Sequence, residues 1–418
     1  MEGHANKKKI INDPVYGFVI ITSNLLYDLI EHPIFQRLRH IRQLGLTDMI
    51  FPGALHTRFH HALGALHLMG KALDKLREKG VEVSPQEYEA AQIAILLHDI
   101  GHGPFSHALE ETLLPGIAHE SISFLLMKEL NRFFGGKLDM ALQFFQNTYP
   151  RSFFHQLINS QLDIDRLDYL RRDSFYTGVS EGSIGIERII FMLHVVNDQL
   201  VVEEKGIYSI ENFLNARRLM YWQVYLHKTS VSAERMMVNL IKRAQYIVQS
   251  GGVLPCSAAL HFFLSRSYTL EDFMKNEALR NFGRLDDHDI WGAIKLWQDH
   301  EDRILSLLSN MLLQRNLFQI MLKSGPVDKA DVENVRTAVA TKFGLLQKEA
   351  AYLFSHGTVS NEAYVHEGSG INILTKQGEI KEITLVSDLP NVKALSKIVK
   401  KSYLCFPKNV PLNTVKRK

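Results

Sequence analysis

An almost wholly apolar run, residues 90–97, constrains this fold more than any other stretch, because it leads directly into His98-Asp99 and then into helix-breaking glycines. A helix of this composition is buried on most of its faces. A buried imidazole and carboxylate need a charged partner, and a divalent metal ion is the obvious one. The sequence therefore predicts a buried helix that carries an active site at its C-terminal end.

Local signals predict where this helix and its neighbour begin. Ser84 is a suitable N-cap, Pro85 fits the first helical position, and Glu87 completes a capping box. A second helix is expected from Arg58 to about Lys79, before a glycine stop. Both helices carry histidines that are candidates for metal binding.

Composition excludes several classes of protein. With 418 residues, of which 46% are hydrophobic, the chain can bury a large core. No segment approaches the roughly 18 uninterrupted apolar residues of a membrane span, and residues 1–9 do not resemble a signal peptide, so we expect a cytoplasmic protein without membrane contact. Cys256 and Cys405 predict no disulfide framework. A net charge of +3 does not indicate a nucleic-acid-binding protein.

Strand signals are few, so we predict a mainly α fold with a helical core, short β-hairpins and a small mixed α/β C-terminal lobe. One hairpin is expected in residues 9–21 and another in residues 199–210, with its turn at 205–206. We expect three parts: a core over residues 1–245, a helical extension over 246–358 and the lobe over 359–418. Strands of the lobe are expected at residues 362–366, 371–375 and 380–386.

Two imidazoles and two carboxylates from three predicted helices form a candidate metal site: His61, His98, Asp99 and Asp165. This set suits one divalent ion, such as Mn, Mg, Fe, Zn or Ni, and the absence of nearby cysteine argues against a closed structural zinc site. His60 is a competing candidate, but successive residues on a helix point about 100° apart. Only one of His60 and His61 is therefore expected to face the ion.

Short motifs surround these residues in chain order. They include Arg58-Phe59-x-His61, His98-Asp99-x-Gly101-His102-Gly103-Pro104 and Asp165-Arg166-x-Asp168-Tyr169. Together they resemble the HD-domain deoxynucleoside triphosphate triphosphohydrolases, a family that includes the vertebrate SAM- and HD-domain dNTPase and bacterial HD phosphohydrolases. The similarity extends over about residues 9–228. It implies an HD-domain fold for the core and hydrolysis of a dNTP to deoxynucleoside and inorganic triphosphate.

The resemblance also implies roles for individual side chains. His119 corresponds to the general acid, Glu110 to the carboxylate that orients it, and Arg58 and His102 to groups beside the α-phosphate. Arg166 stands where the family has lysine. The implied substrate-binding residues are Gln43, Leu44, His107, Arg166, Tyr169, Asp173, Arg217 and Tyr225.

Two of these implied roles concern the sugar and the outer phosphates of the substrate. Leu44 and Tyr225 would pack against the sugar and leave little room for a 2′-hydroxyl, so the preference for deoxynucleotides would be steric. Arg217 would bind the outer phosphates, although adjacent Arg217-Arg218 on a helix is also typical of a solvated face.

The resemblance further implies regulation by a guanine nucleotide at a subunit interface, and hence a homo-oligomer such as a dimer or tetramer. Glu31 stands where the family has the aspartate that reads the guanine edge, which keeps the carboxylate. Glu203 and Glu204 place negative charge where a further activating nucleotide would favour positive charge. The implied positions are Lys9, Ile10, Asn12, Glu31, Gln36, Arg39, His227 and Lys228.

Two other functions are compatible with these residues. The HD motif also occurs in nucleotidases and cyclic-nucleotide phosphodiesterases, although the Gly-Tyr-Pro triplet of the cyclic-dinucleotide enzymes is absent. A nucleotide- or RNA-sensing module that has lost turnover is the second alternative. The complete set of metal-ligand residues argues against that module.

Overall fold

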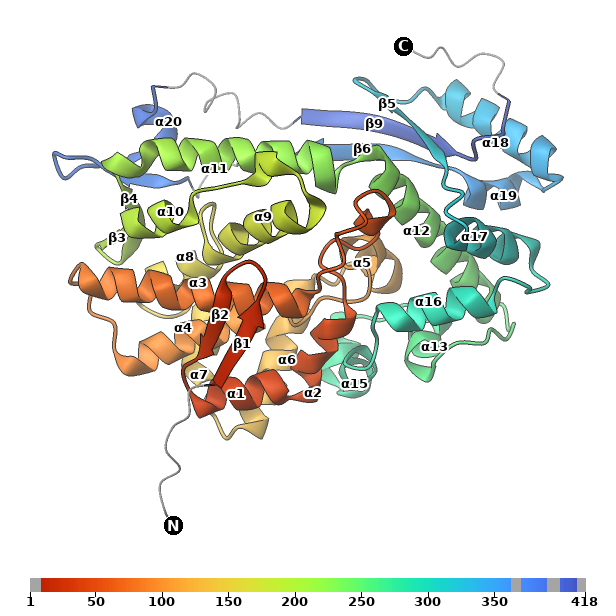
Figure 1. The fold of residues 1–418 in the computed structure, drawn as a ribbon. Coiled ribbons are helices and arrows are strands. Elements are labelled where there is room, and N and C mark those ends of the chain that lie inside the picture. The colour runs from red at the N-terminus through yellow and green to blue at the C-terminus, as the bar shows by residue number, and fades with distance from the viewer. Residues whose placement is uncertain (1–8, 362–369, 389–398, 412–418) are drawn as a thin grey trace.

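The computed structural model describes residues 9–361, 370–388 and 399–411. Helices dominate these residues (Figure 1), which confirms the mainly α fold class. The chain begins with the expected antiparallel hairpin, in which Lys9 pairs with Ile21 and Asp13 with Gly17. Its first elements are β1 (Lys9–Asp13), β2 (Gly17–Ile21), α1 (Asn24–Glu31), α2 (Pro33–Gln36), η1 (Arg37–His40) and η2 (Thr47–Met49).

The central helices form the core that surrounds the candidate metal residues. The helix predicted from the apolar run is α4, and every residue from Ala90 to Leu97 is buried in it. It packs against α3, which in turn packs against α9. These elements are α3 (Arg58–Glu78), α4 (Pro85–Leu97), α5 (His107–Leu113), α6 (His119–Phe133), α7 (Asp139–Phe145), α8 (Phe153–Ile158), α9 (Ile164–Thr177), η3 (Ser180–Gly182) and α10 (Ile186–Met192).

The second predicted hairpin is wrong in its position. Residues 193–196 pair with residues 199–203, and the turn between them is Asn197-Asp198, whose φ angles are 52° and 54°. Asparagine and aspartate tolerate this left-handed conformation, which favours a tight hairpin turn. The segment after residue 206 is helical instead. These elements are β3 (Leu193–Val196), β4 (Gln199–Glu203), η4 (Glu204–Gly206), α11 (Ile207–Met220) and the π-helix η5 (Tyr221–Tyr225).

A second group of helices follows and covers one side of the core (Figure 1). The long helix α12 packs against both α5 and α17, so it joins this group to the central helices. The elements are α12 (Lys228–Gln249), α13 (Ala258–Ser265), α14 (Leu270–Met274), α15 (Glu277–Phe282), α16 (Asp287–Leu296) and α17 (Arg303–Leu313).

The last part of the described chain contributes strands to two different sheets. β7 pairs in parallel with β4 of the core, while β9 lies between β5 and β6. The expected strand at 380–386 is a strand only to Glu382, and the one at 362–366 lies outside the described residues. The elements are β5 (Gln319–Lys323), α18 (Lys329–Phe343), α19 (Gln347–Ala350), η6 (Ala351–Leu353), β6 (Ser355–Asn361), β7 (Asn372–Leu374), β8 (Ile380–Glu382), α20 (Ile383–Val386) and β9 (Val399–Phe406).

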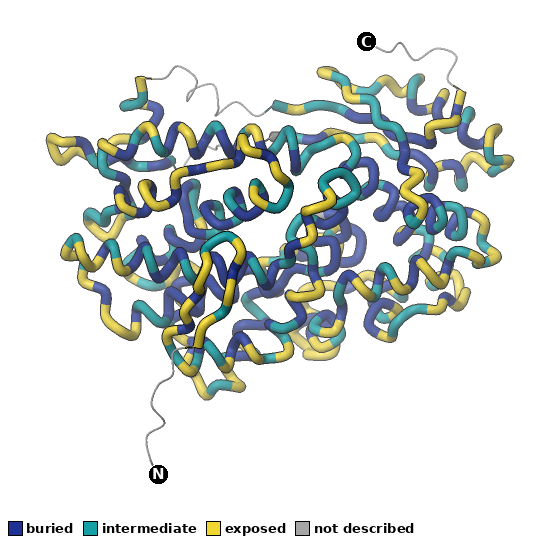
Figure 2. Tube along the Cα trace, in the orientation of Figure 1, coloured by how far each residue is buried: buried dark blue, intermediate teal, exposed yellow. Residues whose placement is uncertain are grey.

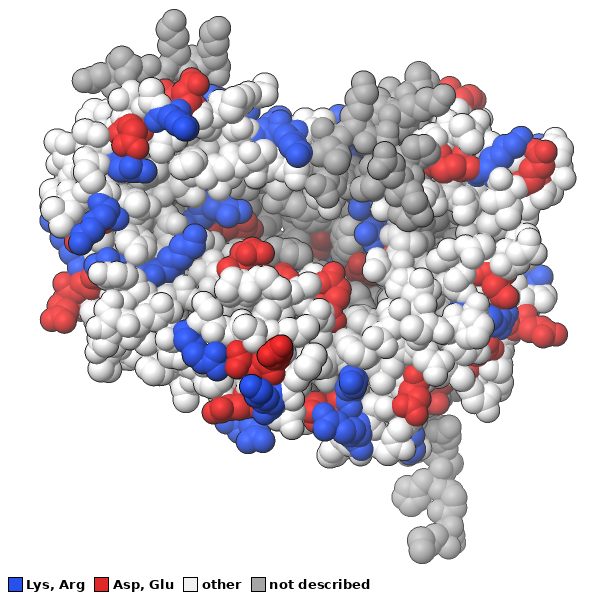
Figure 3. Space-filling view, turned by 180° about the vertical axis from the view of Figure 1, so that it is seen from behind, with Lys and Arg blue, Asp and Glu red and all other residues white. Residues whose placement is uncertain are grey.

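Burial and surface charge follow this layout. The buried stretches gather on the inner helices, and exposed residues lie on the outer loops and helix faces (Figure 2). Seen from behind, basic and acidic side chains are interspersed around a central hollow (Figure 3). Among the described residues, no helix combines the length and apolar character that a bilayer crossing requires.

Candidate active site

Four side chains converge where α3, α4 and α9 meet. The Oδ1 atom of Asp165 lies 3.1 Å from Nε2 of His61 and 3.4 Å from Nε2 of His98. The two Nε2 atoms are 3.5 Å apart. Asp99 approaches the same point, with its Oδ1 atom 3.3 Å from Nε2 of His98. The structure thus brings together the four residues that the sequence singled out as metal ligands. His60 points elsewhere, since its Nδ1 atom accepts a hydrogen bond from the Thr57 amide.

The spacing of these atoms fits a divalent metal ion. Metal–ligand bonds of about 2.0–2.2 Å place neighbouring ligand atoms roughly 2.9–3.5 Å apart. Nδ1 of His98 lies 2.7 Å from the Ile95 carbonyl oxygen, and Nδ1 of His61 lies 2.8 Å from a carboxylate oxygen of Asp168. Because each Nδ1–H has an acceptor, each Nε2 lone pair is left to face the centre. The donor set could therefore hold one divalent ion.

A buried ionic network positions His61. Asp168 accepts a hydrogen bond from Nε of Arg172 at 2.9 Å, and Arg172 also donates from Nη1 to Asp13 of the hairpin at 2.8 Å. Gly64 permits this approach, since a Cβ atom there would lie 2.0 Å from a carboxylate oxygen of Asp168. The hairpin, α3 and α9 are consequently held around one imidazole.

We expect Asp168→Asn to weaken metal binding by about 10–100-fold, because the partner of a metal-binding histidine sets its tautomer and basicity. Competition with a chelator would measure the metal dissociation constant. Asp28→Asn, at an exposed position of α1, is the matched control. An unchanged dissociation constant in Asp168→Asn would contradict this role.

The loop after Asp99 folds back against the centre in a strained conformation. Phe105 and Ser106 have φ angles of 51° and 40°, which cost free energy in residues other than glycine. Ser106 Oγ accepts a hydrogen bond from Nε of Arg58 at 2.9 Å, and the Phe105 amide donates to Asp287 Oδ1 at 2.9 Å. Arg58 also pairs with Asp99. Side chains from two distant parts of the chain, Arg58 and Asp287, thus hold this strained conformation.

Arg37 also holds this loop in place, through hydrogen bonds to its backbone. Its buried guanidinium donates to the carbonyl oxygens of Ile100 at 2.9 Å, His102 at 2.8 Å and Leu285 at 2.9 Å. Sequence analysis missed Arg37 and Asp287. Their partners Leu285 and Phe105 lie far away in the chain, so no local pattern indicated these contacts.

His119, the expected general acid, lies beside its expected carboxylate. Its Nδ1 atom is 3.2 Å from Oε1 of Glu110, and its ring stacks on His102 with a centroid distance of 3.8 Å. Burial lowers the pKa of His119, but the hydrogen bond to Glu110 and the charge of Asp99 outweigh it, so the pKa is raised. Burial and the charge of Arg58 lower the pKa of His102 well below its ordinary value. The two stacked imidazoles therefore have pKa values that are shifted in opposite directions.

Arg217 is buried, so the alternative of a solvated helix face is wrong. It donates from Nη1 to Gln161 at 3.1 Å, while its Nε finds no hydrogen-bond partner within the described part of the chain. Arg166 pairs with Asp163, and its Nε also has no partner there. Burial raises the pKa of Tyr169 against the opposing charges of Arg217 and Arg166. Arg166 and Arg217 thus each have an Nε donor that an anion beside Tyr169 could use.

The expected sugar-binding residues are joined through His56, which the sequence did not single out. Asp173 is buried and bound on both oxygens, by Nε2 of His56 at 2.7 Å and by the hydroxyl of Tyr225 at 2.8 Å. The backbone amide of Gln43 donates a hydrogen bond to the backbone carbonyl oxygen of His56 at 3.0 Å. Oε1 of Gln43 is buried, with no hydrogen-bond partner among the described residues. Leu44 packs beside it, against the core.

The expected regulatory positions fall in two separate places. Nε of Arg39 donates to Oε1 of Gln36 at 2.7 Å, and its guanidinium lies 3.6 Å from the centroid of the Phe59 ring. The first of the two places comprises Lys9, Ile10 and Asn12 of β1, Glu31 of α1, Gln36 of α2 and Arg39 of η1, and the second comprises His227 and Lys228 at the start of α12.

The side chain of His107, the remaining expected substrate-binding residue, lies outside the described part of the structure.

Comparison with known proteins places this chain among known families. Residues 58–172 match the family described as HD domain, and residues 184–251 match the one described as HD associated region. The crystal structure of a phosphohydrolase from Bacteroides thetaiotaomicron has a TM-score of 0.93 and 50% identity, over 96% of this chain and 100% of that chain. This chain belongs to the HD-domain phosphohydrolase family. The Bacillus subtilis protein YwfO is 34% identical over 91% of this chain and 88% of its own length.

One relative of this HD-domain phosphohydrolase carries a named activity. A Dictyostelium discoideum protein named deoxynucleoside triphosphate triphosphohydrolase SAMHD1 homolog is 31% identical over 58% of this chain and 50% of its own length. As a member of the family, the chain is a metal-dependent phosphohydrolase. His61, His98 and Asp99 form a His/Asp cluster that could hold its ion.

Proposed function

We propose that this HD-domain phosphohydrolase hydrolyses a deoxynucleoside triphosphate to deoxynucleoside and inorganic triphosphate. The observation that carries the proposal is the pair of guanidiniums of the half-buried Arg166 and the buried Arg217, because the Nε atom of each has no hydrogen-bond partner among the described residues. A triphosphate supplies the negative charge that such donors require. The similarity to the Dictyostelium discoideum protein supports the same substrate class.

Each step of this reaction has a residue suited to it. A divalent ion held by His61, His98, Asp99 and Asp165 supplies, when bound, charge neutralisation and a water of lowered pKa. Water adds to the α-phosphorus as the bond to the 5′-oxygen breaks. His119 donates its proton to that oxygen, and Glu110 holds the ring in place. The products are a neutral 5′-hydroxyl and triphosphate.

Anion contacts divide between the two ends of the triphosphate. Arg58 and His102 are assigned to the α-phosphate, because both lie beside Asp99 at the centre. Arg166, Arg217 and Tyr169 are assigned to the outer phosphates. Fixed donors in a site with little water stabilise developing charge more strongly than solvent does.

Chromatography of the products from each dNTP and rNTP, over a series of divalent ions, tests this function. Triphosphate and deoxynucleoside in equal amounts are expected. Release of monophosphate or pyrophosphate would instead identify another HD phosphohydrolase activity. Nucleotide binding without any product under every metal condition would favour a sensing module.

Tyr225 tests the proposed steric choice between deoxyribose and ribose. We expect Tyr225→Ala to lower the ratio of kcat/KM for dNTP over rNTP by about 10–200-fold, the usual range for discrimination by a small difference in pocket volume. Tyr225→Phe keeps the ring and loses only the hydrogen bond to Asp173, so it is the matched control. Equal ratios in the wild type and Tyr225→Ala would contradict the steric explanation.

We also propose that a guanine nucleotide activates the enzyme through a homo-oligomer. One face of the β1–β2 hairpin carries Ile10, Phe18 and Ile20, which are 57%, 65% and 44% exposed. Exposed apolar surface of this kind supports coverage by a second subunit. Asn12, another expected regulatory position, lies opposite Phe18 on the same face.

Arg39→Ala tests this regulation. We expect added GTP to raise hydrolysis of a different dNTP and to shift the oligomer distribution in the wild type, because a ligand favours the assembly that it binds preferentially. Arg39→Ala should lose both responses and keep its metal content. Arg280→Ala, at an exposed position of α15, is the control. If added GTP leaves the rate of dNTP hydrolysis by the wild type unchanged, the proposal of activation is wrong.

A further inference from the structure

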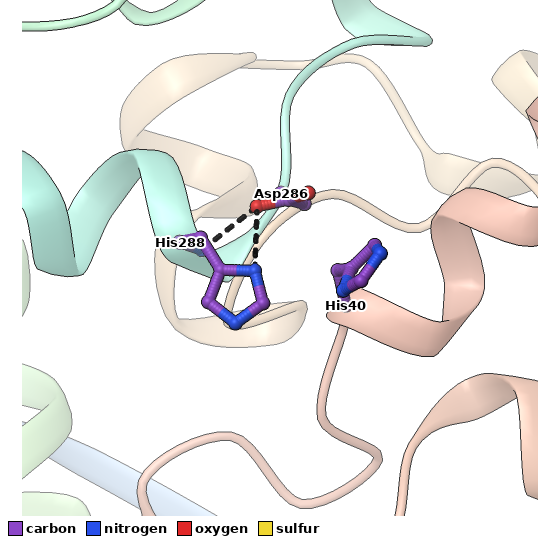
Figure 4. Close-up of side chains that lie close together, drawn as sticks. All are labelled: His40, Asp286 and His288. Atoms are coloured by element: carbon purple, nitrogen blue, oxygen red, sulfur yellow. Dashed lines mark hydrogen bonds and ion pairs between the residues drawn. The ribbon is translucent and has the colours of Figure 1, made fainter.

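A cluster of metal-ligating side chains lies outside the active site. Of the clusters formed by the described residues, two involve Asp99 and belong to the active site, whereas the third consists of His40, Asp286 and His288. Their ligand atoms lie within 4.8 Å of one another. Figure 4 shows both imidazoles beside the carboxylate, from two separate segments of chain. His40 ends η1, whereas Asp286 and His288 flank the first residue of α16.

The backbone around this cluster is already held in place. Asp286 caps α16, because its Oδ1 atom accepts a hydrogen bond from the His288 amide at 2.8 Å. The next residue, Asp287, accepts from the Arg42 amide at 2.9 Å, and Arg37 donates to the Leu285 carbonyl oxygen at 2.9 Å. Bonds on both sides of the cluster therefore fix η1 relative to α16, so little ordering is required for a ligand to join them.

The side chains themselves are accessible and arranged for a cation. His40 and His288 are exposed, with their ring centroids 5.0 Å apart. Nδ1 of His288 is 3.6 Å from Oδ1 of Asp286. Asp286 and His288 also line a solvent-open hollow of about 340 Å³, through which an ion could enter. Asp289 adds a further carboxylate in the first turn of α16.

We propose that His40, Asp286 and His288 form a second metal site, of the class that binds Zn²⁺, separate from the HD centre. Two imidazoles and a carboxylate favour Zn²⁺ and related transition metals over Mg²⁺ or Ca²⁺, which prefer all-oxygen sites. Three protein ligands leave a fourth position for water. The proposal does not depend on the identity of the substrate.

An ion at this site fastens η1 to the start of α16. Both segments hold the strained catalytic loop, since Arg37 binds its carbonyl oxygens and Asp287 binds the Phe105 amide. An ion bound at this second site therefore stabilises the active-site loop, and it is a different ion from the one at the catalytic centre.

Zinc content measured after equilibrium dialysis at micromolar free Zn²⁺ tests the proposal. Two ions per chain are expected in the wild type, and one each in His288→Ala and His40→Ala. Asp165→Ala should retain the ion of the second site while it loses the catalytic one, so the two assignments fail independently. His261→Ala, at an exposed position of α13, is the matched control.

Thermal unfolding provides a second readout. A hundredfold excess of Zn²⁺ over its dissociation constant should raise the melting temperature of the Asp165→Ala protein by about 3 °C. Adding His288→Ala should remove that rise. Equal zinc content in the wild type and both histidine variants, or uptake only at millimolar Zn²⁺, would identify an adventitious ion only and overturn the site.

Discussion

Asp165→Ala should lose both the catalytic metal ion and activity. The Asp165 carboxylate lies 3.1 Å from His61 and 3.4 Å from His98, so its removal leaves a gap in the ligand set. Hydrolysis is expected to fall by at least about a thousandfold, because the ion supplies both charge neutralisation and the activated water. Elemental analysis of the purified variant and a phosphate-ester hydrolysis assay measure the two effects.

Asp28→Ala, at an exposed position of α1, is the control for this substitution. It should leave metal content and turnover unchanged. Full metal occupancy together with normal turnover in Asp165→Ala would remove Asp165 from the ligand set.

His119→Ala should lower kcat by about 10²–10⁴-fold while the metal content stays unchanged, as is usual when a positioned general acid is lost. His119 touches Glu110 and stacks on His102, but it is not among the four residues that converge on the metal centre. Loss of kcat without loss of metal therefore separates proton donation from metal binding. Single-turnover rates with saturating dNTP measure the effect.

Glu110→Gln provides a graded comparison for His119→Ala. The amide can still accept the hydrogen bond but lacks the negative charge that helps raise the pKa of His119, so a smaller loss of kcat is expected. His261→Ala controls for the loss of an exposed imidazole. Near-normal kcat in His119→Ala would assign the proton to another group.

Local patterns in the sequence were sufficient for the elements that carry the centre. Ser84 and Glu87 form the reciprocal capping bonds expected of them, at 3.1 Å and 2.8 Å, and the apolar run that follows is buried throughout. Caps and side-chain periodicity act over a few residues, so they are readable without knowledge of the fold. The four metal-ligand candidates were chosen for a different reason, namely their mixed ligand chemistry and the motifs around them.

Short strand-like segments were not decided by local pattern. Residues 207–210 alternate in the manner of a strand, yet they begin α11. The actual turn of this hairpin is Asn197-Asp198, where two consecutive residues adopt positive φ. A stretch of four residues satisfies several secondary structures equally, and packing against the rest of the protein selects among them.

The sequence alone indicated the helices around the centre, a set of candidate metal-ligand residues and the family that this protein resembles. It did not specify the contacts that hold the centre in shape. Arg37 meets Leu285, and Asp287 meets Phe105, only because helices distant in the chain pack together. The burial of Arg217 arises in the same way. Such contacts depend on the three-dimensional arrangement of whole elements, and no local pattern encodes a distance across hundreds of residues.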